Sequence, residues 1–429
     1  MKITYLLPGL GRSGGNIVLY HFMDGLASRG HDITAVAPEG RFEWSPGCWH
    51  QLTKRASQKP FLRRSIVNLG KLIVRGVARV TVADGLEDIV RATRMIRALL
   101  KNSPKSNDVI IASFCWTAFA GYYLPASRWI YHMQHMEELF FISELGRKIA
   151  RLSYFLPFEQ VANSKWLNNW VAALTNKRPN LILNPGIDTN VFSGSESFVR
   201  RKYSGQLRPF RILTYVDPGR IWKGFDDAVA AMKLVTRAIS SDAVEWILFG
   251  FGDPGAKVAG VPYKFLGTVF GKDLANLYAS VHAVLCPSWY ESFPLPPLEA
   301  MACGTAVVTT CYGVEDYALD GLNALVVPPR DHQRTAEALL RLINNPDLCT
   351  RLALAGIETA KSFSWDRAIR MLEEFLSLQK PADLPDQMKH YKLAARLGGL
   401  LAGGGFDVEL LNKLLTAGSQ IIGAEGSSK

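Results

Sequence analysis

Two carboxylates eight residues apart are the side chains of this sequence best placed for chemistry. They lie in the segment WYESFPLPPLEAMA, where Glu291 follows the apolar run 283–288 and Glu299 follows two prolines. Because the first turn of a helix tolerates proline, Pro296 and Pro297 predict a helix with Glu299 in its first turn, where the helix dipole favours a carboxylate. Glu291 is then expected at the carboxyl end of a strand, where open α/β sheets bind ligands. A Glu299 that only caps its helix is the alternative.

A glycine-rich loop, Gly9-Leu-Gly11-Arg-Ser-Gly14-Gly15, follows the first apolar run and precedes a helical pattern. It matches G-x-G-x-x-G, in which glycines let the backbone approach a phosphate and the helix supplies N–H donors. Dinucleotide binding is one interpretation, with Glu39 near the end of the second strand as the ribose ligand. Tight packing of the helix on the sheet is the other, because such a turn also requires glycine.

The elements that must position these residues are strands that alternate with helices. Near-continuous apolar runs predict parallel strands covered on both faces, and their alternation with helical segments predicts α/β, doubly wound sheets. The pattern restarts after the polar stretch 193–209, so we expect two domains, 1–195 and 196–380, and a helical tail, 381–429, with a flexible end. The expected strands are 3–8, 33–38, 109–114, 128–133, 160–164 and 181–186, then 211–216, 246–251, 264–269, 283–288, 306–310 and 324–329.

The composition narrows the class of protein. Of 429 residues 48% are hydrophobic, and Lys plus Arg exceed Asp plus Glu by 49 − 38 = 11. A mainly disordered chain is excluded, and the positive charge favours anionic partners. Six cysteines without a C-x-x-C pair favour reduced thiols in the cytosol. No apolar run is long enough to span a membrane or to form a signal peptide, so we expect a cytoplasmic protein.

One segment, 61–80, has the pattern of a basic amphipathic helix. Leu62, Ile66 and other apolar residues fall on one face, and four basic residues fall on the opposite face. Such a helix is typical of proteins that dock on an anionic membrane surface, and a helix packed on the core with a solvated charged face is the alternative. The four basic residues are Arg64, Lys71, Arg75 and Arg79.

The E-x7-E pattern of Glu291 and Glu299 resembles that of the retaining family 4 glycosyltransferases. Similar segments surround it, FLGTVFGKDLANLYASVHAVLCPS before and MACGTAVVTTCYGVEDYALDGLNALVVPPRD after. Gly14-Gly15, Ala162-Asn-Ser164 and NPGID at 184–188 also correspond to family segments. The resemblance extends to about Trp365 and implies the GT-B fold, two Rossmann-like domains that face each other across a cleft.

The resemblance also implies roles for individual residues. Glu299 would bind the ribose hydroxyls of a nucleotide-sugar donor, and Glu291 would contact the donor sugar near the reacting carbon. Arg220 and Lys223, in DPGRIWKGFDD, would bind the diphosphate, where fixed cations stabilise the charge of the leaving group. The alternative for this pair is a helix N-terminal loop with solvated charges. The donor site would be completed by the backbone of Ser292, Phe293, Pro294 and Leu295 and by Gly14 and Gly15.

Two features of the sequence modify this expectation. Many members of the family have glycines where this chain has Ser292 and Pro294, so the loop here is stiffer and has fewer N–H donors. A family histidine near the fourth strand contacts the donor sugar. His132 and His135 are the candidates, and we favour His135 because it is expected past the strand end, facing the cleft.

The sequence therefore predicts a retaining glycosyltransferase that moves a sugar from a nucleotide-sugar donor to an acceptor hydroxyl, without metal or cofactor. The second domain is expected to bind the donor, and the first the acceptor. A saccharide or lipid-linked saccharide acceptor at the inner face of the cytoplasmic membrane would place the enzyme in cell-surface polysaccharide or lipopolysaccharide biosynthesis. Alternatives are a nucleotide-sugar epimerase and a non-catalytic nucleotide- or saccharide-binding protein. Nucleic-acid binding is not expected, because the basic residues form no groove pattern interleaved with aromatic residues.

Overall fold

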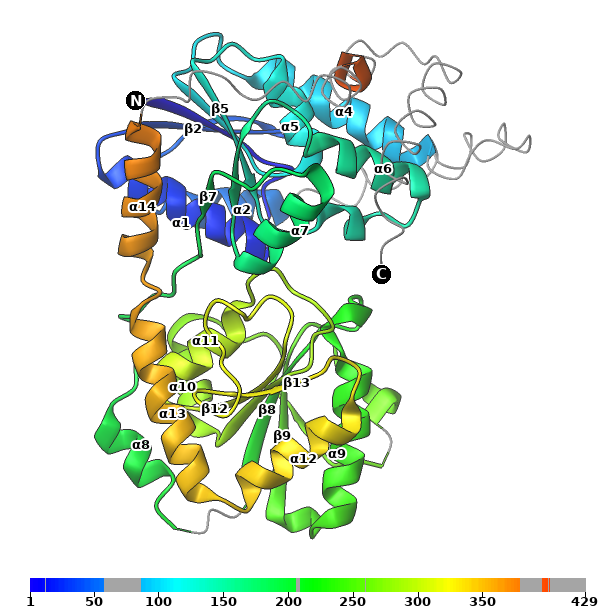
Figure 1. The fold of residues 1–429 in the computed structure, drawn as a ribbon, viewed down its shortest axis with the longest axis vertical. Helices are drawn as coiled ribbons and strands as arrows, with labels where there is room; N and C mark the ends of the chain where they lie inside the picture. Colours follow the sequence, from blue (N-terminus) through cyan, green and yellow to red (C-terminus); the bar gives the residue numbers. More distant parts are fainter. Residues whose placement is uncertain are drawn as a thin grey trace, which may run out of the picture. The chain divides into compact units, whose positions relative to one another are not determined.

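The computed structural model describes residues 1–11, 13–57, 86–205, 209–258, 260–378, 396–399 and 401. It divides the chain into two compact units. Unit 1 contains residues 1–163 and 167–183 and the described residues from Ile369 onward, and unit 2 contains Ser164–Trp166 and Asn184–Ala368. Each unit is built around one sheet with helices packed against it (Figure 1).

Unit 1 has a seven-stranded sheet in the order β3-β2-β1-β4-β5-β6-β7, parallel except for β3. The six expected strands of this half are confirmed, and β3 is an additional antiparallel strand at the edge. The strands are β1 Lys2–Leu6, β2 Asp32–Ala37, β3 Gly40–Glu43, β4 Val109–Ala112, β5 Arg128–Met133, β6 Glu159–Ala162 and β7 Leu181–Ile182. The helices are α1 Gly14–Ser28, α2 Trp49–Ser57, α4 Leu86–Asn102, α5 Cys115–Tyr122, η1 Glu137–Phe140, α6 Glu144–Ser153 and α7 Lys165–Thr175.

Unit 2 has a six-stranded, wholly parallel sheet in the order β10-β9-β8-β11-β12-β13. All six expected strands are confirmed. They are β8 Phe210–Val216, β9 Val244–Gly250, β10 Lys264–Phe265, β11 Ala283–Cys286, β12 Ala306–Thr310 and β13 Leu325–Val327. The helices are α8 Glu196–Lys202, η2 Ile221–Lys223, α9 Phe225–Ala238, η3 Ser241–Ala243, η4 Gly255–Val258, α10 Gly271–Ser280, α11 Leu295–Ala302, α12 His332–Ile343 and α13 Pro346–Lys361. This is the strand order of a doubly wound dinucleotide-binding fold.

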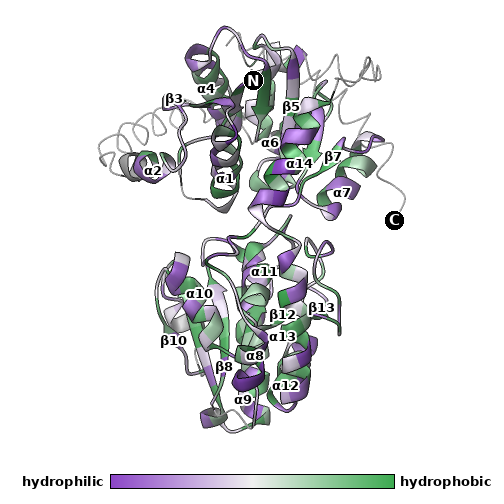
Figure 2. Ribbon diagram, turned by 90° about the vertical axis from the view of Figure 1, so that its left-hand side faces the viewer, coloured by the Kyte–Doolittle hydropathy of each residue, from purple (hydrophilic) through white to green (hydrophobic). Residues whose placement is uncertain are grey.

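Both faces of the unit 2 sheet are covered, as the near-continuous apolar strands predict. In β8, Ile212 packs into one apolar cluster and its neighbour Leu213 into the other, because successive side chains of a strand point to opposite faces. The first cluster includes residues of α9 and α12, and the second includes residues of α10 and α11. Figure 2 shows that helices such as α12 and α14 carry hydrophilic as well as hydrophobic residues.

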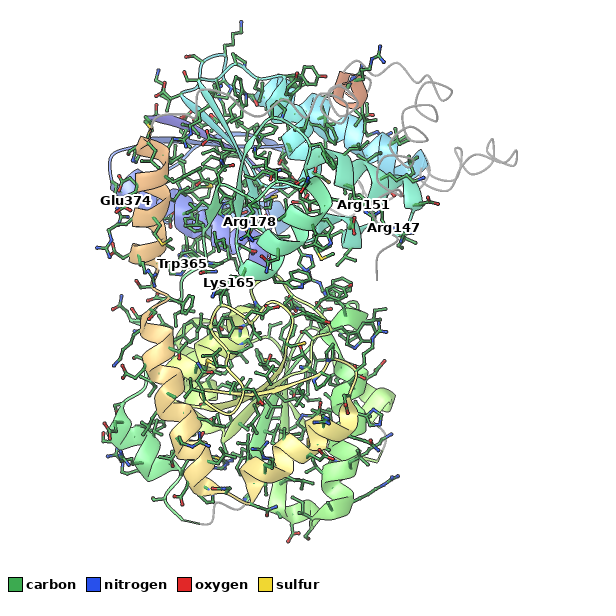
Figure 3. All side chains as sticks on the ribbon, in the orientation of Figure 1. Arg147, Arg151, Lys165, Arg178, Trp365 and Glu374 are labelled. Carbon is green, nitrogen blue, oxygen red and sulfur yellow. The ribbon has the colours of Figure 1, made fainter. Side chains whose placement is uncertain are left out.

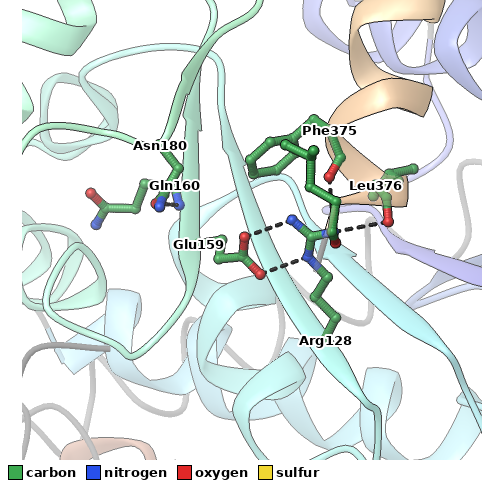
Figure 4. Close-up of polar contacts among 7 residues, drawn as sticks. Arg128, Glu159, Gln160, Asn180, Phe375 and Leu376 are labelled. Carbon is green, nitrogen blue, oxygen red and sulfur yellow. Dashed lines mark hydrogen bonds and ion pairs between the residues drawn. The ribbon is translucent and has the colours of Figure 1, made fainter. Parts of the chain in front are cut away.

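Helix α14, Trp365–Ser377, begins in unit 2 and continues in unit 1. Its end is held by Arg128 of β5, whose guanidinium donates to the carbonyl oxygens of Phe375 and Leu376, at 2.9 Å each (Figure 4). The same guanidinium forms a bidentate ion pair with Glu159 of β6, at 2.6 and 2.7 Å. The two units differ from the expected domains, whose boundaries were placed at 195/196 and 380/381. The last helix packs on unit 1, so unit 2 ends before residue 380.

Among the described residues, no helix is both long enough and apolar enough to cross a membrane. The predicted amphipathic helix 61–80, with Arg64, Lys71, Arg75 and Arg79, lies outside the described residues, as does most of the tail 381–429.

Candidate functional site

The candidate site of unit 2 lies where the strand order of its sheet reverses. β8 and β11 are neighbours in the sheet but are not consecutive in the chain, so the connections that follow them lead away in opposite directions. Such a reversal leaves a crevice at the carboxyl ends of the two strands, which is where doubly wound folds bind ligands. The segment that follows β8 carries Arg220 and Lys223, and the segment that follows β11 carries Glu291.

Lys223 and Glu291 meet at this point. Lys223 Nζ donates to Glu291 Oε1 at 2.5 Å, and the two side chains are 20% and 13% exposed. The ammonium also lies 5.9 Å from the ring centroid of Tyr215, the penultimate residue of β8. A partly buried cation and carboxylate in direct contact form a polarised pair that a diphosphate and a hydroxyl group can each engage.

Two glycines allow neighbouring backbone segments to approach the segment that carries Glu291. Gly224 has φ +68°, and a Cβ on it would lie 1.9 Å from the carbonyl oxygen of Pro287. Gly313 has φ +87°, and a Cβ on it would lie 2.1 Å from the carbonyl oxygen of Glu291. Any side chain at these positions would push the segments apart, so the glycines help to fix the geometry of the ion pair.

Arg220 lies at the start of the same turn, with its side chain directed to an acid of that turn. Its Nε is 3.3 Å from Asp217 Oδ2, and the arginine side chain is 47% exposed. The main chain closes the turn, because the N–H of Lys223 donates to the carbonyl oxygen of Arg220 at 3.0 Å. Arg220 and Lys223 thus occupy one short turn at the carboxyl end of β8, as the sequence predicts.

Glu299 lies in α11, but not in the turn that was predicted. The helix begins at Leu295, with Pro294 as its N-cap, so Glu299 is its fifth residue and the first turn holds no acid. The prediction that the helix dipole favours the Glu299 carboxylate is therefore wrong, because this effect is confined to the first turn. Tyr278 of α10 instead donates to its Oε2 at 3.2 Å. Burial raises the pKa of Glu299 to about 7, although the hydrogen bond from Tyr278 lowers it.

This raised pKa predicts that the Glu299 carboxylate costs stability. The folded protein holds the proton up to about pH 7, whereas the unfolded chain loses it near 4.5, so folding becomes less favourable as the pH rises through this window. We expect Glu299→Gln to raise the Tm relative to the wild type by an amount that grows from pH 4.5 to 7 and is constant above. Thermal unfolding against pH measures it, with the exposed Glu358→Gln as control. A Tm difference that does not grow with pH would contradict the assignment.

The segment between the two acids is tied to the core of unit 2. Ser292 and Phe293 are buried, and the Phe293 ring lies 5.2 Å from the ring of Tyr317. The hydroxyl of Tyr317 donates to the carbonyl oxygen of Pro294 at 2.7 Å, immediately before Leu295 opens α11. The Phe293 side chain is therefore part of the core, and a contribution of the segment 292–295 to a donor site rests on its backbone.

In unit 1 the two candidate histidines have different environments. His132 lies within β5, is 1% exposed, and neither ring nitrogen has a hydrogen-bond partner. Burial lowers the pKa of His132 to about 4, so it is a neutral core residue. His135 lies two residues past the end of β5, as expected, and is half-buried, with Nδ1 3.2 Å from the carbonyl oxygen of Met136.

The glycine loop of unit 1 follows β1, next to β4, at the corresponding reversal of the first sheet. Asn16 ties the loop together, because its Nδ2 donates to the carbonyl oxygens of Gly9 and Gly11 at 3.0 and 3.2 Å. A Cβ on Gly15 would lie 3.4 Å from Gln134 Oε1, so the loop reaches the segment that carries His135. Gly14 opens α1 and is exposed, with nothing within 4 Å of the position of a Cβ.

Basic side chains also project from the described part of unit 1, among them Arg147 and Arg151 of α6 (Figure 3). Arg151 forms an ion pair with Glu138 of η1, and Arg147 is exposed. The neighbouring Glu137 is buried, accepts a hydrogen bond from the Tyr131 hydroxyl at 2.8 Å, and has its pKa raised by burial to about 8. Both acids lie in the first turn of η1.

Sequence reasoning missed a group of aromatic and cationic residues beside the ion pair. The indole N–H of Trp289 donates to Asp227 Oδ2 at 2.5 Å, and the Arg330 guanidinium lies 3.9 Å from the centroid of the Trp289 ring. The rings of Trp222 and Tyr290 are parallel within 8°, with centroids 6.4 Å apart. Trp222 and Tyr290 each adjoin a predicted site residue in the sequence, but nothing in the sequence indicates that Arg330 reaches Trp289.

The described part of the chain contains no group of three or more His, Cys, Asp or Glu side chains that could hold a metal ion.

Residues 212–345, which include the whole candidate site of unit 2, match the model of a family described as glycosyl transferases, group 1. The chain is 31% identical over 208 residues to a D-inositol 3-phosphate glycosyltransferase of Actinosynnema mirum, covering 45% of this chain and 50% of that protein. It is 38% identical over 112 residues to the protein of the same name from Frankia alni, covering 26% and 28%. The chain thus spans half or less of the length of these relatives.

Two solved structures share the fold over most of the chain. Sucrose-phosphate synthase from Thermosynechococcus elongatus has a TM-score of 0.63 at 17% identity, covering 87% of this chain and 98% of that one. Anabaena Alr3699/HepE, solved in complex with UDP-glucose, has a TM-score of 0.59 at 19% identity, covering 88% and 99%. The two doubly wound domains are those of the GT-B fold, as the sequence predicts.

Proposed function

We propose that the protein is a retaining, metal-independent glycosyltransferase that moves a sugar from a nucleotide-sugar donor to an acceptor hydroxyl. The observation that carries this proposal is the contact of Lys223 with Glu291, at 2.5 Å, at the point where the strand order reverses. A family match over the same residues and relatives named as glycosyltransferases support it.

In the proposed reaction, Lys223 takes up the charge of the departing nucleoside diphosphate. As the bond between the sugar and the diphosphate breaks, negative charge grows on the phosphate oxygens, and a fixed ammonium stabilises this charge in the transition state. Arg220, on the same turn, adds a second cation once its guanidinium leaves Asp217. Because these side chains supply positive charge, we propose that the reaction requires no metal ion.

Glu291 has a role that follows from its partner. In the free protein its carboxylate is neutralised by Lys223, and a bound diphosphate would compete for that ammonium. The carboxylate would then be available to accept hydrogen bonds from hydroxyls of the donor sugar, which would orient the anomeric carbon toward the acceptor.

Glu299 would bind the ribose of the donor. A carboxylate accepts hydrogen bonds from two vicinal hydroxyls, and Tyr278 leaves Oε1 of Glu299 for this purpose while it holds Oε2. Donor binding would favour the ionised form and lower the raised pKa of this acid. The affinity for the donor is therefore expected to increase as the pH rises toward and through 7.

The acceptor that we propose is a saccharide, free or linked to lipid, bound by unit 1 near His135 and the glycine loop that ends in Gly14 and Gly15. A role in cell-surface polysaccharide or lipopolysaccharide biosynthesis, with attachment to the inner face of the cytoplasmic membrane, is part of this proposal and rests on the sequence pattern of 61–80.

Thermal-shift titration with UDP, GDP, dTDP and ADP and their common sugars tests the proposal. A true donor at a hundred times its Kd stabilises the fold by about 2.7 kcal/mol. Glu299→Ala is expected to weaken binding of the selected nucleotide by about 10- to 100-fold, because it removes a charged hydrogen-bond acceptor worth about 1.5–3 kcal/mol. Glu358→Ala, which removes an exposed carboxylate of α13, is the control.

The proposal is wrong if no nucleotide stabilises the protein. The ribose role alone is wrong if Glu299→Ala binds as tightly as the wild type. Retention is tested separately by the anomeric configuration of the first product formed, read by NMR before it equilibrates.

A further inference from the structure

Beside the ion pair lies a surface that the proposed mechanism does not use, formed by Trp222, Trp289, Tyr290 and Arg330. We call it the Trp289 surface. All four side chains come from segments that follow β8, β11 and β13, and these strands end at the same edge of the sheet because they are parallel. Trp289 and Tyr290 directly precede Glu291 in the chain, and Trp222 directly precedes Lys223.

Trp289 is held rigidly on two sides. Its indole N–H donates to Asp227 in the first turn of α9 at 2.5 Å, and its main-chain N–H donates to the carbonyl oxygen of Trp222 at 2.7 Å. These two bonds fix the orientation of the ring, and the guanidinium of Arg330 covers one of its faces at 3.9 Å.

Arg330 adopts a costly backbone conformation to reach this position. Its φ is +63°, and it is one of two non-glycine residues with positive φ in the described part of the chain. A residue with a Cβ is strained there, and strain of this kind is found where a side chain must be presented in one place. The Arg330 side chain is exposed, and no carboxylate of the described residues forms an ion pair with it.

The stacking leaves the guanidinium ready for an anion. The central carbon of the group lies over the Trp289 ring and the side chain is exposed, so guanidinium N–H donors remain accessible for the fork-like contact that fits a carboxylate or a phosphate. The charge also acts on the neighbouring hydroxyl, because Arg330 lowers the pKa of Tyr290 against the larger effect of burial, which raises it. The half-buried rings of Trp222 and Tyr290 offer apolar area of the kind on which sugar rings pack.

We propose that the Trp289 surface is a subsite for a sugar that carries an oxyanion, a phosphate or a carboxylate, with Arg330 as the residue that selects for this charge. The proposal rests on the proposed glycosyltransferase function and assigns to that site the chemical class of one of its two sugars. The charged sugar is either the one transferred or the one that accepts it.

Pairs of neutral and anionic ligands distinguish a charged donor sugar from a charged acceptor sugar. Binding of UDP-glucose is compared with that of UDP-glucuronate, and binding of glucose with that of glucose 6-phosphate in the presence of UDP, by isothermal titration calorimetry on the full chain. If the nucleotide screen selects GDP, the donor pair is GDP-mannose and GDP-mannuronate, with GDP in the acceptor pair. We expect the anionic member of one pair to bind at least about tenfold more tightly, as for a charged hydrogen bond.

Arg330→Gln is expected to abolish this preference and to leave the Kd of the nucleoside diphosphate within about twofold, since the phosphate-binding cations are untouched. Arg334→Gln, four residues further along in the first turn of α12 and 69% exposed, is the matched control and should keep the preference. Arg330→Gly should lose the preference with a Tm that is unchanged or higher, because glycine relieves the strain at this φ. A residue with only a structural role would give a lower Tm.

The subsite is disproved if the wild type shows no preference in either pair, or if Arg330→Gln keeps it. Neither result contradicts the proposed function as long as a nucleoside diphosphate still binds. If no nucleotide binds to the wild type, it is the proposed function that fails.

Discussion

Replacing Lys223 with Gln is expected to lower kcat by about 10²- to 10³-fold, the loss typical of removing one group that stabilises the charge of a transition state. The ammonium is the cation in contact with Glu291, at 2.5 Å, and it stands where the diphosphate is proposed to depart. Glutamine is polar and one atom shorter than lysine, but it carries no charge and cannot neutralise the growing charge. Initial rates at saturating donor measure the effect, because they exclude a change in donor affinity.

Loss of the cation also removes the ion pair of the partly buried Glu291 with Lys223, which would lower stability as well. The double variant Lys223→Gln/Glu291→Gln separates the two effects. It should recover most of the lost Tm, because the carboxylate charge is removed together with the ammonium, but it should not recover turnover. Lys272→Gln, which removes an exposed lysine of α10, should retain both the Tm and the rate. A kcat of Lys223→Gln within a few-fold of the wild type would exclude Lys223 from leaving-group stabilisation.

The strands could be predicted because burial on two faces leaves a simple signature. Runs such as 211–216 and 306–310 are predominantly apolar and show no regular alternation with polar residues, and each forms a strand of a wholly parallel sheet. The strand that the sequence did not reveal, β3, is an edge strand in which exposed and half-buried residues alternate, from Gly40 to Glu43. An edge strand of four residues contains too few buried positions to be recognised from its composition.

The site could be predicted only in part, because its contacts depend on distances across the sheet. Topology alone places the ends of β8 and β11 side by side, and hence Lys223 near Glu291 although 68 residues separate them. The predicted position of Glu299 in its helix was wrong by one residue, because both prolines were placed at the start of the helix, whereas Leu295 precedes them.

The contact of the last helix with the first sheet could not be predicted from the sequence either. The amphipathic pattern of α14 predicts a buried face but does not say which unit covers it. That depends on Arg128, a charged residue within β5 whose guanidinium is paired with Glu159 and binds the carbonyl oxygens at the end of the helix (Figure 4). A buried ion pair of this kind leaves no periodic signal in the sequence.

Gly224→Ala is expected to lower kcat by about 10²-fold, since a displacement of about 1 Å in a positioned catalytic group costs this much. A Cβ at this position would lie 1.9 Å from the carbonyl oxygen of Pro287. The atom that this Cβ would meet belongs to the backbone, so no side chain can move aside. The turn that ends at Gly224 must therefore shift away from β11, and it would carry Lys223 away from Glu291.

The same change is expected to destabilise the fold by about 1–3 kcal/mol, the cost of a residue with a Cβ held in the left-handed region. Gly271→Ala provides the matched control: Gly271 also opens a helix with positive φ, +58°, but a Cβ there would meet nothing within 4 Å. Both variants should lose stability in urea unfolding, and only Gly224→Ala should lose turnover in addition. Equal turnover in the two variants would show that the close approach of the turn to Pro287 does not position Lys223 for the reaction.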